Sequence, residues 1–143
     1  MDDVDRIASA RLRHDGQRYT DNRRQLVHLL ASADVPLTIP EILERRRDLA
    51  QSSVYRNLAV LEQSGLVQKI VTSDEWARFD LAEDLTEHHH HVICSSCGLV
   101  RDFTLSPRLE RSIGEALARV ADETSFTVQS HRLDLVGVCP DCA

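Results

Sequence analysis

The sequence lacks the long hydrophobic run that marks a membrane protein. No window of about 18 consecutive apolar residues occurs in its 143 residues, so no membrane span is expected. The first residues, MDDVDRIASARLRHDG, are charged and lack the apolar core of a secretory signal peptide. Repeats and long linkers are missing as well. These absences favour a cytoplasmic protein of one medium domain or two small domains that pack together.

An excess of basic residues is also missing. The net charge is −6, and residues 81–143 carry five basic against ten acidic side chains. An acidic total argues against a protein that coats nucleic acid without sequence preference. Local recognition of DNA by a basic face stays open, and the acidic C-terminal half is well suited to accept cations.

Catalytic signatures are not found either. A zinc hydrolase needs an open coordination position and a general base, and the chain has metal-binding residue types but no H-E-x-x-H or comparable motif. We therefore do not expect an enzyme. A zinc-stapled protein-interaction module is a further alternative, but it leaves the helical pattern of the N-terminal half unexplained.

The chain does contain four cysteines, arranged as two Cys-x-x-Cys pairs, CSSC and CPDC. In a reducing cytosol, cysteines in this arrangement favour metal ligation over disulfides. A gap of two residues lets both sulfurs of a pair reach one ion at about 2.3 Å, which favours tetrahedral zinc. A redox-active pair and an iron–sulfur cluster are the competing interpretations. The four candidate ligands are Cys94, Cys97, Cys139 and Cys142.

Four consecutive histidines precede the first cysteine pair in the segment EHHHHVICSSCGLVRDF. The run is internal, so it is not a purification tag. If the segment is extended, its side chains alternate between two faces. His88 and His90 then share one face, while His89 and His91 share the other. Two such pairs suit two different metal sites; the competing interpretation is a solvated end of a strand.

The N-terminal half has the signals of short helices. Thr38 and Glu41 have the spacing of a capping box. The segment QSSVYRNLAVLEQSGLV follows closely, and Ser52 or Ser53 can cap its helix, with Gly65 at the position of a C-terminal glycine. Two short helices joined by a tight turn predict a helix-turn-helix.

A hairpin is expected next, with strands at residues 66–71 and 76–81, and it gives the helix-turn-helix a wing. The helix before Gly65 is then the recognition helix, with Tyr55 and Arg56 exposed near its N-terminus. We expect Tyr55 to contact bases and the arginines to contact phosphates. The competing interpretation for the arginines is a solvated helix face. The candidate DNA contacts are Tyr55, Arg56, Arg23, Arg24 and Ser53.

The C-terminal half differs in pattern. Strands are expected near residues 88–94, 99–103 and 126–138, and a helix is expected to start at Ser106. His131 lies in the last of these strands, within reach of the histidine run across the sheet. The stripe expected to be buried on the helix comprises Leu109, Ile113, Leu117 and Val120.

These elements predict an α+β chain with a winged helix-turn-helix domain at residues 1–82 and a small α/β domain at residues 83–143. In this combination the sequence resembles the ferric uptake regulator (Fur) family of metal-dependent transcriptional repressors over nearly its whole length. The resemblance is carried by LRHDGQRYTDNRRQLVHLL, SSVYRNLAVLEQSGLV, HHHHVICSSCGLVRDF and SHRLDLVGVCPDC. It implies a hinge between the domains and a C-terminal domain that forms a homodimer. Because a dimer presents two recognition helices, we expect its operator in double-stranded DNA to be palindromic.

The resemblance also implies three metal sites. The four cysteines hold a structural Zn²⁺. A hinge regulatory site falls on Asp80, His89, His91 and Asp102. A second regulatory site falls on His88, His90, Glu110 and His131.

Two departures from the family pattern concern the sensed signal. Many relatives have a hinge histidine before the second helix, where this chain has Leu37 in VPLTIPE. Zinc-sensing relatives usually have a cysteine shortly before the histidine run, and this chain has none there. His14 and His28 are spare candidates, more typical of surface or helix-packing residues. We expect the regulatory metal to be Zn²⁺ or Fe²⁺, with Mn²⁺ or Ni²⁺ also open. Peroxide sensing is the alternative.

Overall fold

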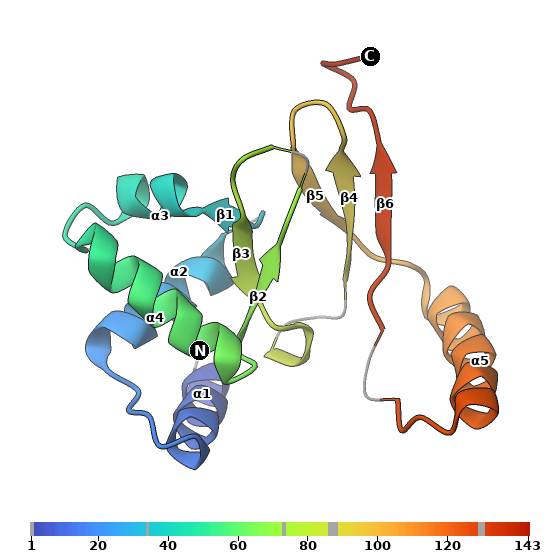
Figure 1. The fold of residues 1–143 in the computed structure, drawn as a ribbon, viewed down its shortest axis with the longest axis horizontal. Helices are drawn as coiled ribbons and strands as arrows, with labels where there is room; N and C mark the ends of the chain where they lie inside the picture. Colours follow the sequence, from blue (N-terminus) through green and yellow to red (C-terminus); the bar gives the residue numbers. More distant parts are fainter. Residues whose placement is uncertain (1, 34, 73, 86–88, 129–130) are drawn as a thin grey trace.

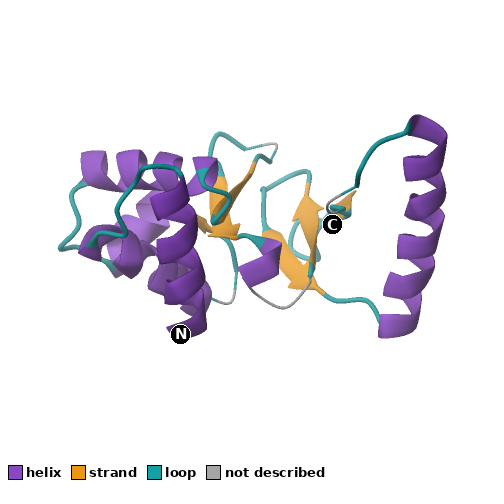
Figure 2. Ribbon diagram, turned by 90° about the horizontal axis from the view of Figure 1, so that it is seen from below, coloured by secondary structure: helices purple, strands orange, loops and turns teal. Residues whose placement is uncertain are grey.

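The computed structural model describes residues 2–33, 35–72, 74–85, 89–128 and 131–143. Two three-stranded sheets stand side by side, with strand orders β1-β3-β2 and β5-β4-β6 (Figure 1). Helices α1 to α4 lie on the side of the first sheet away from the second sheet, and α5 lies at the outer side of the second (Figure 2). The expected α+β class is confirmed.

The N-terminal part of the chain runs from α1 to β3. Its elements are α1 (Asp2–His14), α2 (Asp21–Ser32), β1 (Leu37–Thr38), α3 (Ile39–Arg45), α4 (Gln51–Gln63), β2 (Val67–Ile70) and β3 (Arg78–Leu81). The C-terminal part follows a short 3₁₀ turn, η1 (Glu83–Leu85). It contains β4 (His90–Cys94), β5 (Val100–Phe103), α5 (Pro107–Thr124) and β6 (Asp134–Gly137).

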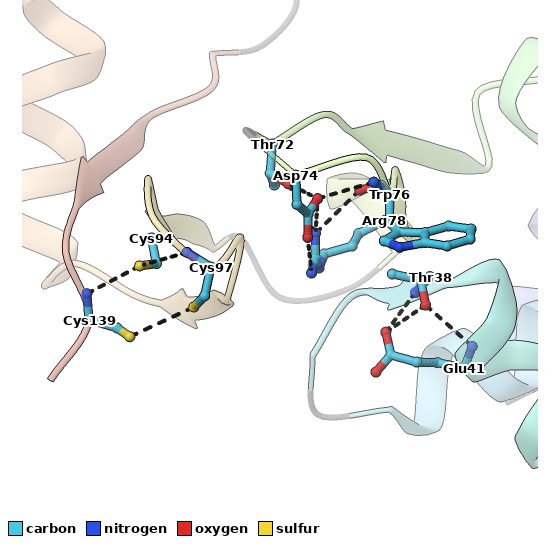
Figure 3. A network of polar contacts seen from close by, with 9 residues as sticks. All are labelled: Thr38, Glu41, Thr72, Asp74, Trp76, Arg78, Cys94, Cys97 and Cys139. Carbon is cyan, nitrogen blue, oxygen red and sulfur yellow. Dashed lines mark hydrogen bonds and ion pairs between the residues drawn. The ribbon is translucent and has the colours of Figure 1, made fainter. Parts of the chain in front are cut away.

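Local capping explains where several helices begin. The hydroxyl of Thr38 accepts from the backbone N–H of Glu41, and the Glu41 carboxylate accepts from the backbone N–H of Thr38, so the expected capping box is present (Figure 3). The expected serine cap of α4 is wrong. This helix is capped by Ala50 without a side-chain hydrogen bond, so Ser52 and Ser53 lie inside its first turn. Gly65 follows α4 with φ +72°, as a C-terminal glycine should.

One large core fills the N-terminal part. It joins α1, α2, α3 and α4 to the inner face of the first sheet. Strand β3 supplies Phe79 and Leu81 to this core, while Arg78 and Asp80 alternate with them toward the other side. Leu85 of η1 also joins the core. The domain boundary at residue 82 stays a prediction.

The expected strands are shorter than predicted, and the strand predicted at residues 66–71 spans Val67–Ile70. The strand predicted at residues 76–81 begins at Arg78, because the backbone N–H of Trp76 is engaged by Asp74 within the preceding turn. The strand predicted at residues 126–138 is confined to Asp134–Gly137. Its pairing with β4 is parallel and joins Asp134–Gly137 to His91–Cys94.

The buried stripe predicted on α5 is wrong for the single chain. None of the residues of α5 is buried, and Leu109 and Val120 are 52% and 48% exposed. The physical reason is visible in Figures 1 and 2, where α5 stands at the outer edge of the molecule. Strand β6 is exposed as well. Among the described helices, none combines the length and the apolar character needed to cross a membrane.

A carboxylate at the centre of a polar contact joins α1 to α2. Asp5 accepts hydrogen bonds from the hydroxyl of Tyr19 (2.6 Å) and from Arg24 Nε (3.2 Å), and it lies 2.8 Å from His28 Nε2. Burial raises the pKa of Asp5, but these hydrogen bonds outweigh it, and the pKa lies below its usual range. His28, a spare metal-ligand candidate, is thus held in helix packing.

Substitution of Asp5 is therefore expected to destabilise the fold. Asp5→Ala leaves the Tyr19 hydroxyl and Arg24 without their acceptor and should lower the free energy of unfolding by about 1–3 kcal/mol at pH 7, measured by urea denaturation. Because the pKa is lowered on folding, this stabilisation exists at neutral pH and disappears as the pH falls below about 4. Asp3→Ala, which removes a highly exposed carboxylate from the same helix, is the control and should change stability by less than about 0.5 kcal/mol. Equal effects of the two variants would contradict the role given to Asp5.

Candidate functional site

The β2–β3 hairpin faces the β4–β5 hairpin across the two parts of the chain. Cross-strand pairing places Gln68 opposite Asp80 and Ile70 opposite Arg78, so these four side chains share the face away from the core. On the other hairpin, His91 pairs with Asp102 and Ile93 with Val100. Between the hairpins, Ile70, Ile93 and Val100 form a small buried apolar cluster. We call this contact the joint between the two parts.

At one end of the joint, four metal-binding side chains converge. Asp80 Oδ2 lies 3.0 Å from His89 Nε2 and 3.4 Å from His91 Nε2. Asp102 Oδ1 lies 3.3 Å from His91 Nε2, and its Oδ2 lies 3.9 Å from His89 Nε2. One ligand atom from each of the four residues lies within 4.8 Å of all the others. The expected hinge residues are therefore brought together; their role as ligands stays a prediction.

The charges of this hinge group favour a cation. Burial raises the pKa of Asp102, and the negative charge of Asp80 raises it further, against the opposite effect of His89 and His91. The backbone N–H of Leu81 donates to Asp80 Oδ1 at 2.9 Å, so Asp80 Oδ2 is left to face the histidines. Two imidazole nitrogens and two carboxylate oxygens suit Fe²⁺ or Mn²⁺, whereas a histidine-richer set would suit Zn²⁺ or Ni²⁺.

Leu37 stands where the resemblance places a hinge histidine, and its side chain belongs to the core and not to the hinge group. This residue is completely buried in β1, where it pairs with Phe79 beside Asp80 and belongs to the large core. A contact that the sequence did not predict is that of Asp134, whose Oδ1 lies 3.7 Å from His91 Nδ1. The parallel pairing of β4 with β6 sets these two residues side by side. The sequence signal that could have identified Asp134 is its position in a strand expected to lie beside the histidines.

The second histidine group lies on the opposite face of β4. His90 Nε2 is 2.5 Å from Glu110 Oε1 at the start of α5, and His131 Nε2 is 3.5 Å from Glu110 Oε2. The rings of His90 and His131 stack with their centroids 5.6 Å apart. The alternation expected for the histidine run is thus present for the described residues His89, His90 and His91. His88, which was assigned to this group, lies outside the described residues.

The four cysteines meet at the far end of the second sheet. Their ligand atoms also lie within 4.8 Å of one another, and Cys97 Sγ is 3.8 Å from Cys139 Sγ (Figure 3). The backbone N–H groups of Cys97 and Cys139 donate to Cys94 Sγ, which lowers the pKa of Cys94 to about 6. A thiolate is the form that binds metal, so the donor set fits the predicted zinc.

The residues expected to contact DNA are divided between exposed and engaged positions. Tyr55 is 49% exposed on α4, and Arg56 beside it is exposed. Arg23 is engaged: its Nε donates to Asn57 Oδ1 at 3.0 Å and its Nη1 to the Arg18 carbonyl at 2.7 Å. Arg24 is paired with Asp5. Ser53 Oγ accepts from Asn57 Nδ2 at 3.1 Å.

Comparison with known proteins adds an independent observation. The model of the ferric uptake regulator family matches residues 14–136. The peroxide operon regulator of Bacillus subtilis is 34% identical over 136 residues, covering 92% of this chain and 88% of that protein. The peroxide-responsive repressor PerR of Staphylococcus saprophyticus is 33% identical over 135 residues, covering 92% and 86%. The structure of the Helicobacter pylori ferric uptake regulator Fur, described as having three functional metal binding sites, matches with a TM-score of 0.71 and 25% identity, covering 99% of this chain and 92% of that chain.

Removal of one cysteine should release the structural metal. Cys94→Ser and Cys139→Ser are each expected to lose one zinc per chain and to lower the thermal stability of the C-terminal part, because filling such a site contributes directly to folding. Mass spectrometry of protein purified without added metal gives the zinc content, and calorimetry gives the stability. Ser95→Ala, next to the site but outside the sulfur group, is the control. Full zinc and full stability in both cysteine variants would refute the assignment.

Proposed function

Because this chain belongs to the ferric uptake regulator family, we propose that it is a metal-dependent repressor that binds a specific DNA sequence and regulates metal-ion homeostasis. The observation that carries the proposal is the hinge group. Asp80 comes from the wing hairpin, whereas His89, His91 and Asp102 come from the C-terminal part. A divalent cation bound there supplies positive charge to two carboxylates and links the two parts of the chain.

The orientation of the recognition helix follows from the same strand that carries Asp80. Phe79 and Leu81 of β3 share the large core with Leu58 and Leu61 of α4. A force that holds Asp80 against the histidines therefore also holds α4 in a fixed direction relative to the C-terminal part. Metal binding and DNA binding are then coupled reciprocally, typically by about 1–3 kcal/mol, or roughly 5–150-fold in affinity.

A homodimer on a palindromic operator completes the proposal. The exposed apolar side chains of α5 and β6, among them Leu109, Val120 and Val136, offer a surface for a second copy. Two copies related by a two-fold axis present two α4 helices to successive major grooves of the same DNA. The domains of this arrangement are residues 1–82 and 83–143.

Peroxide sensing is the second candidate, and a specific observation favours it. Asp102 joins Asp80 in the hinge group and makes it a set of two nitrogens and two oxygens, which suits Fe²⁺. The two curated relatives described above are named as peroxide regulators. Zinc has no redox chemistry of its own, whereas iron does. Peroxide should therefore release DNA from the iron-loaded protein and leave the zinc-loaded protein bound.

Gel-shift titration tests the proposed function. Zinc-containing protein is titrated onto a pool of short palindromic duplexes with and without Fe²⁺, Mn²⁺, Zn²⁺ or Ni²⁺. The duplex that the protein binds most tightly is then used in all further titrations. Binding that rises at least fivefold on addition of one of these ions supports the repressor. Binding that is independent of every ion, or absent with all of them, contradicts it.

The histidines should separate into two groups in such titrations. His89→Ala and His91→Ala remove hinge ligands and should abolish the metal-induced gain in DNA affinity, roughly 5–150-fold. His90→Ala and His131→Ala remove the other group and should act alike, with a milder effect on metal response or dimer stability. The measurement is the DNA dissociation constant at saturating metal. Failure of all four variants together, or of none, would exclude the assignment to two sites.

The recognition helix can be tested independently of metal. Tyr55→Ala should weaken specific binding by about 1–3 kcal/mol, the usual size of one base contact, and leave the zinc content unchanged. Competition between operator and scrambled duplex measures the effect. Val71→Ala, which shortens another exposed side chain on the wing hairpin, is the control. Wild-type affinity and selectivity in Tyr55→Ala would show that the helix has been misassigned.

A further inference from the structure

The turn of the wing hairpin is built around one carboxylate. Arg78 Nη1 donates to Asp74 Oδ1 at 3.0 Å and Arg78 Nη2 to Asp74 Oδ2 at 2.9 Å, which makes the pair bidentate. Asp74 Oδ1 also accepts from the hydroxyl of Thr72 at 2.6 Å and from the backbone N–H of Trp76 at 3.2 Å (Figure 3). Both side chains of the ion pair are largely buried, with 14% of Arg78 and 23% of Asp74 exposed.

This carboxylate lies directly against the turn from Cys94 to Gly98 in the other part of the chain, which we call the cysteine knuckle. A Cβ atom placed on Gly98 would clash with Asp74 Oδ2 and would stand 2.6 Å from Asp74 Cγ. Gly98 is buried and has φ +78°, a backbone conformation that favours glycine. In Figure 3 the turn with Asp74 lies beside the segment with Cys97. The close approach therefore depends on the missing side chain of Gly98.

The joint between the two parts thus has three successive layers. The hinge group lies at one end, the apolar cluster of Ile70, Ile93 and Val100 lies in the middle beside Arg78, and Asp74 on Gly98 lies at the other end. Arg78 and Asp80 are two residues apart on β3, so both point toward the C-terminal part. A shift of Arg78 along the joint is transmitted through the strand to the carboxylate of Asp80.

We infer that Asp74 and Arg78, seated on Gly98, are positioning residues for the hinge metal site: they fix β3 against the cysteine knuckle at the place where Asp80 meets His89 and His91. We call these three residues the knuckle latch. The latch makes the affinity of the regulatory metal depend on the shape of the knuckle turn, and hence on the zinc-binding end of the sheet. This inference rests on the proposed function of the hinge group.

Mn²⁺ affinity of the zinc-containing protein tests the latch, measured by chelator competition well below the unfolding temperature. All variants carry His131→Ala, so that the titration reports the hinge group alone. Asp74→Ala and Arg78→Ala should each weaken Mn²⁺ binding about tenfold, the usual effect of losing a residue that orients a ligand, and should keep their zinc. The control is Asp48→Ala, which breaks a similar arginine–aspartate pair, Asp48 with Arg46, elsewhere in the N-terminal part, and it should bind Mn²⁺ like the reference.

A double-mutant cycle tests the contact with Gly98 itself. Gly98→Ala should weaken Mn²⁺ binding in the reference protein but much less in the Asp74→Ala background, because the side chain it displaces is then gone; the backbone strain at positive φ is the same in both. If the effects of Gly98→Ala and Asp74→Ala on Mn²⁺ affinity are additive, the latch is overturned. It is also overturned if Asp74→Ala binds Mn²⁺ as tightly as the reference protein, or if this variant loses its zinc. Asp80→Ala separates this failure from failure of the proposed function: if Asp80→Ala also keeps the reference Mn²⁺ affinity, the hinge assignment is wrong as well.

Discussion

The alternation of side chains along β3 is the constraint on which the rest of the structure depends. In the segment RFDL, Phe79 and Leu81 enter the core of the N-terminal part, whereas Arg78 and Asp80 face the C-terminal part. A strand that slipped by one residue would exchange these faces and place two charges in the core. The burial of Phe79 and Leu81 therefore keeps Asp80 directed at the histidines. Core packing and the proposed metal response are thus properties of one short strand.

In the proposed hinge site, electrostatic repulsion between two carboxylates is the source of the dependence on a cation. Asp80 and Asp102 approach the same pair of imidazoles, and the charge of Asp80 contributes to the raised pKa of Asp102. Without a cation, the repulsion of the two carboxylates opposes the contact between the two parts of the chain. With a cation, the same carboxylates attract it and hold the parts together. In the proposed function, one set of charges thus opposes the closed arrangement in the metal-free protein and favours it in the metal-bound protein.

Local chemistry made part of the fold predictable from sequence. The capping box of Thr38 and Glu41 and the glycine after α4 rest on hydrogen bonds and backbone angles that neighbouring residues determine. The serine cap of α4 failed because Ser52 and Ser53 were equally suited to the position and the helix begins before both. Residues 2–14, to which no element was assigned from sequence, form a helix that packs through Ala8 and Leu12.

Long-range contacts were predictable only where strand periodicity carried them. Alternation along the histidine run was enough to separate His91 from His90, because two adjacent residues of a strand must face opposite ways. The contacts of Asp134 with His91 and of Asp74 with Gly98 depend on strand order and on the packing of the two hairpins. No local pattern encodes which strand lies beside β4 or which turn covers a glycine, so these two contacts required the structure.

The exposed helix α5 connects the stability of the C-terminal part to the symmetry of the proposed operator. Its apolar stripe and strand β6 leave side chains such as Leu109, Val120, Leu135 and Val136 about half or more exposed, an arrangement that water disfavours. A second copy of the chain carries the same surface, so a two-fold axis lets each copy cover the stripe of the other. In the proposed dimer, burial of this stripe is the stabilising contact, and the same axis sets the spacing of the two α4 helices. In the proposed homodimer, the expectation of a palindromic DNA site thus rests on the covering of α5 and not on the identity of the hinge metal.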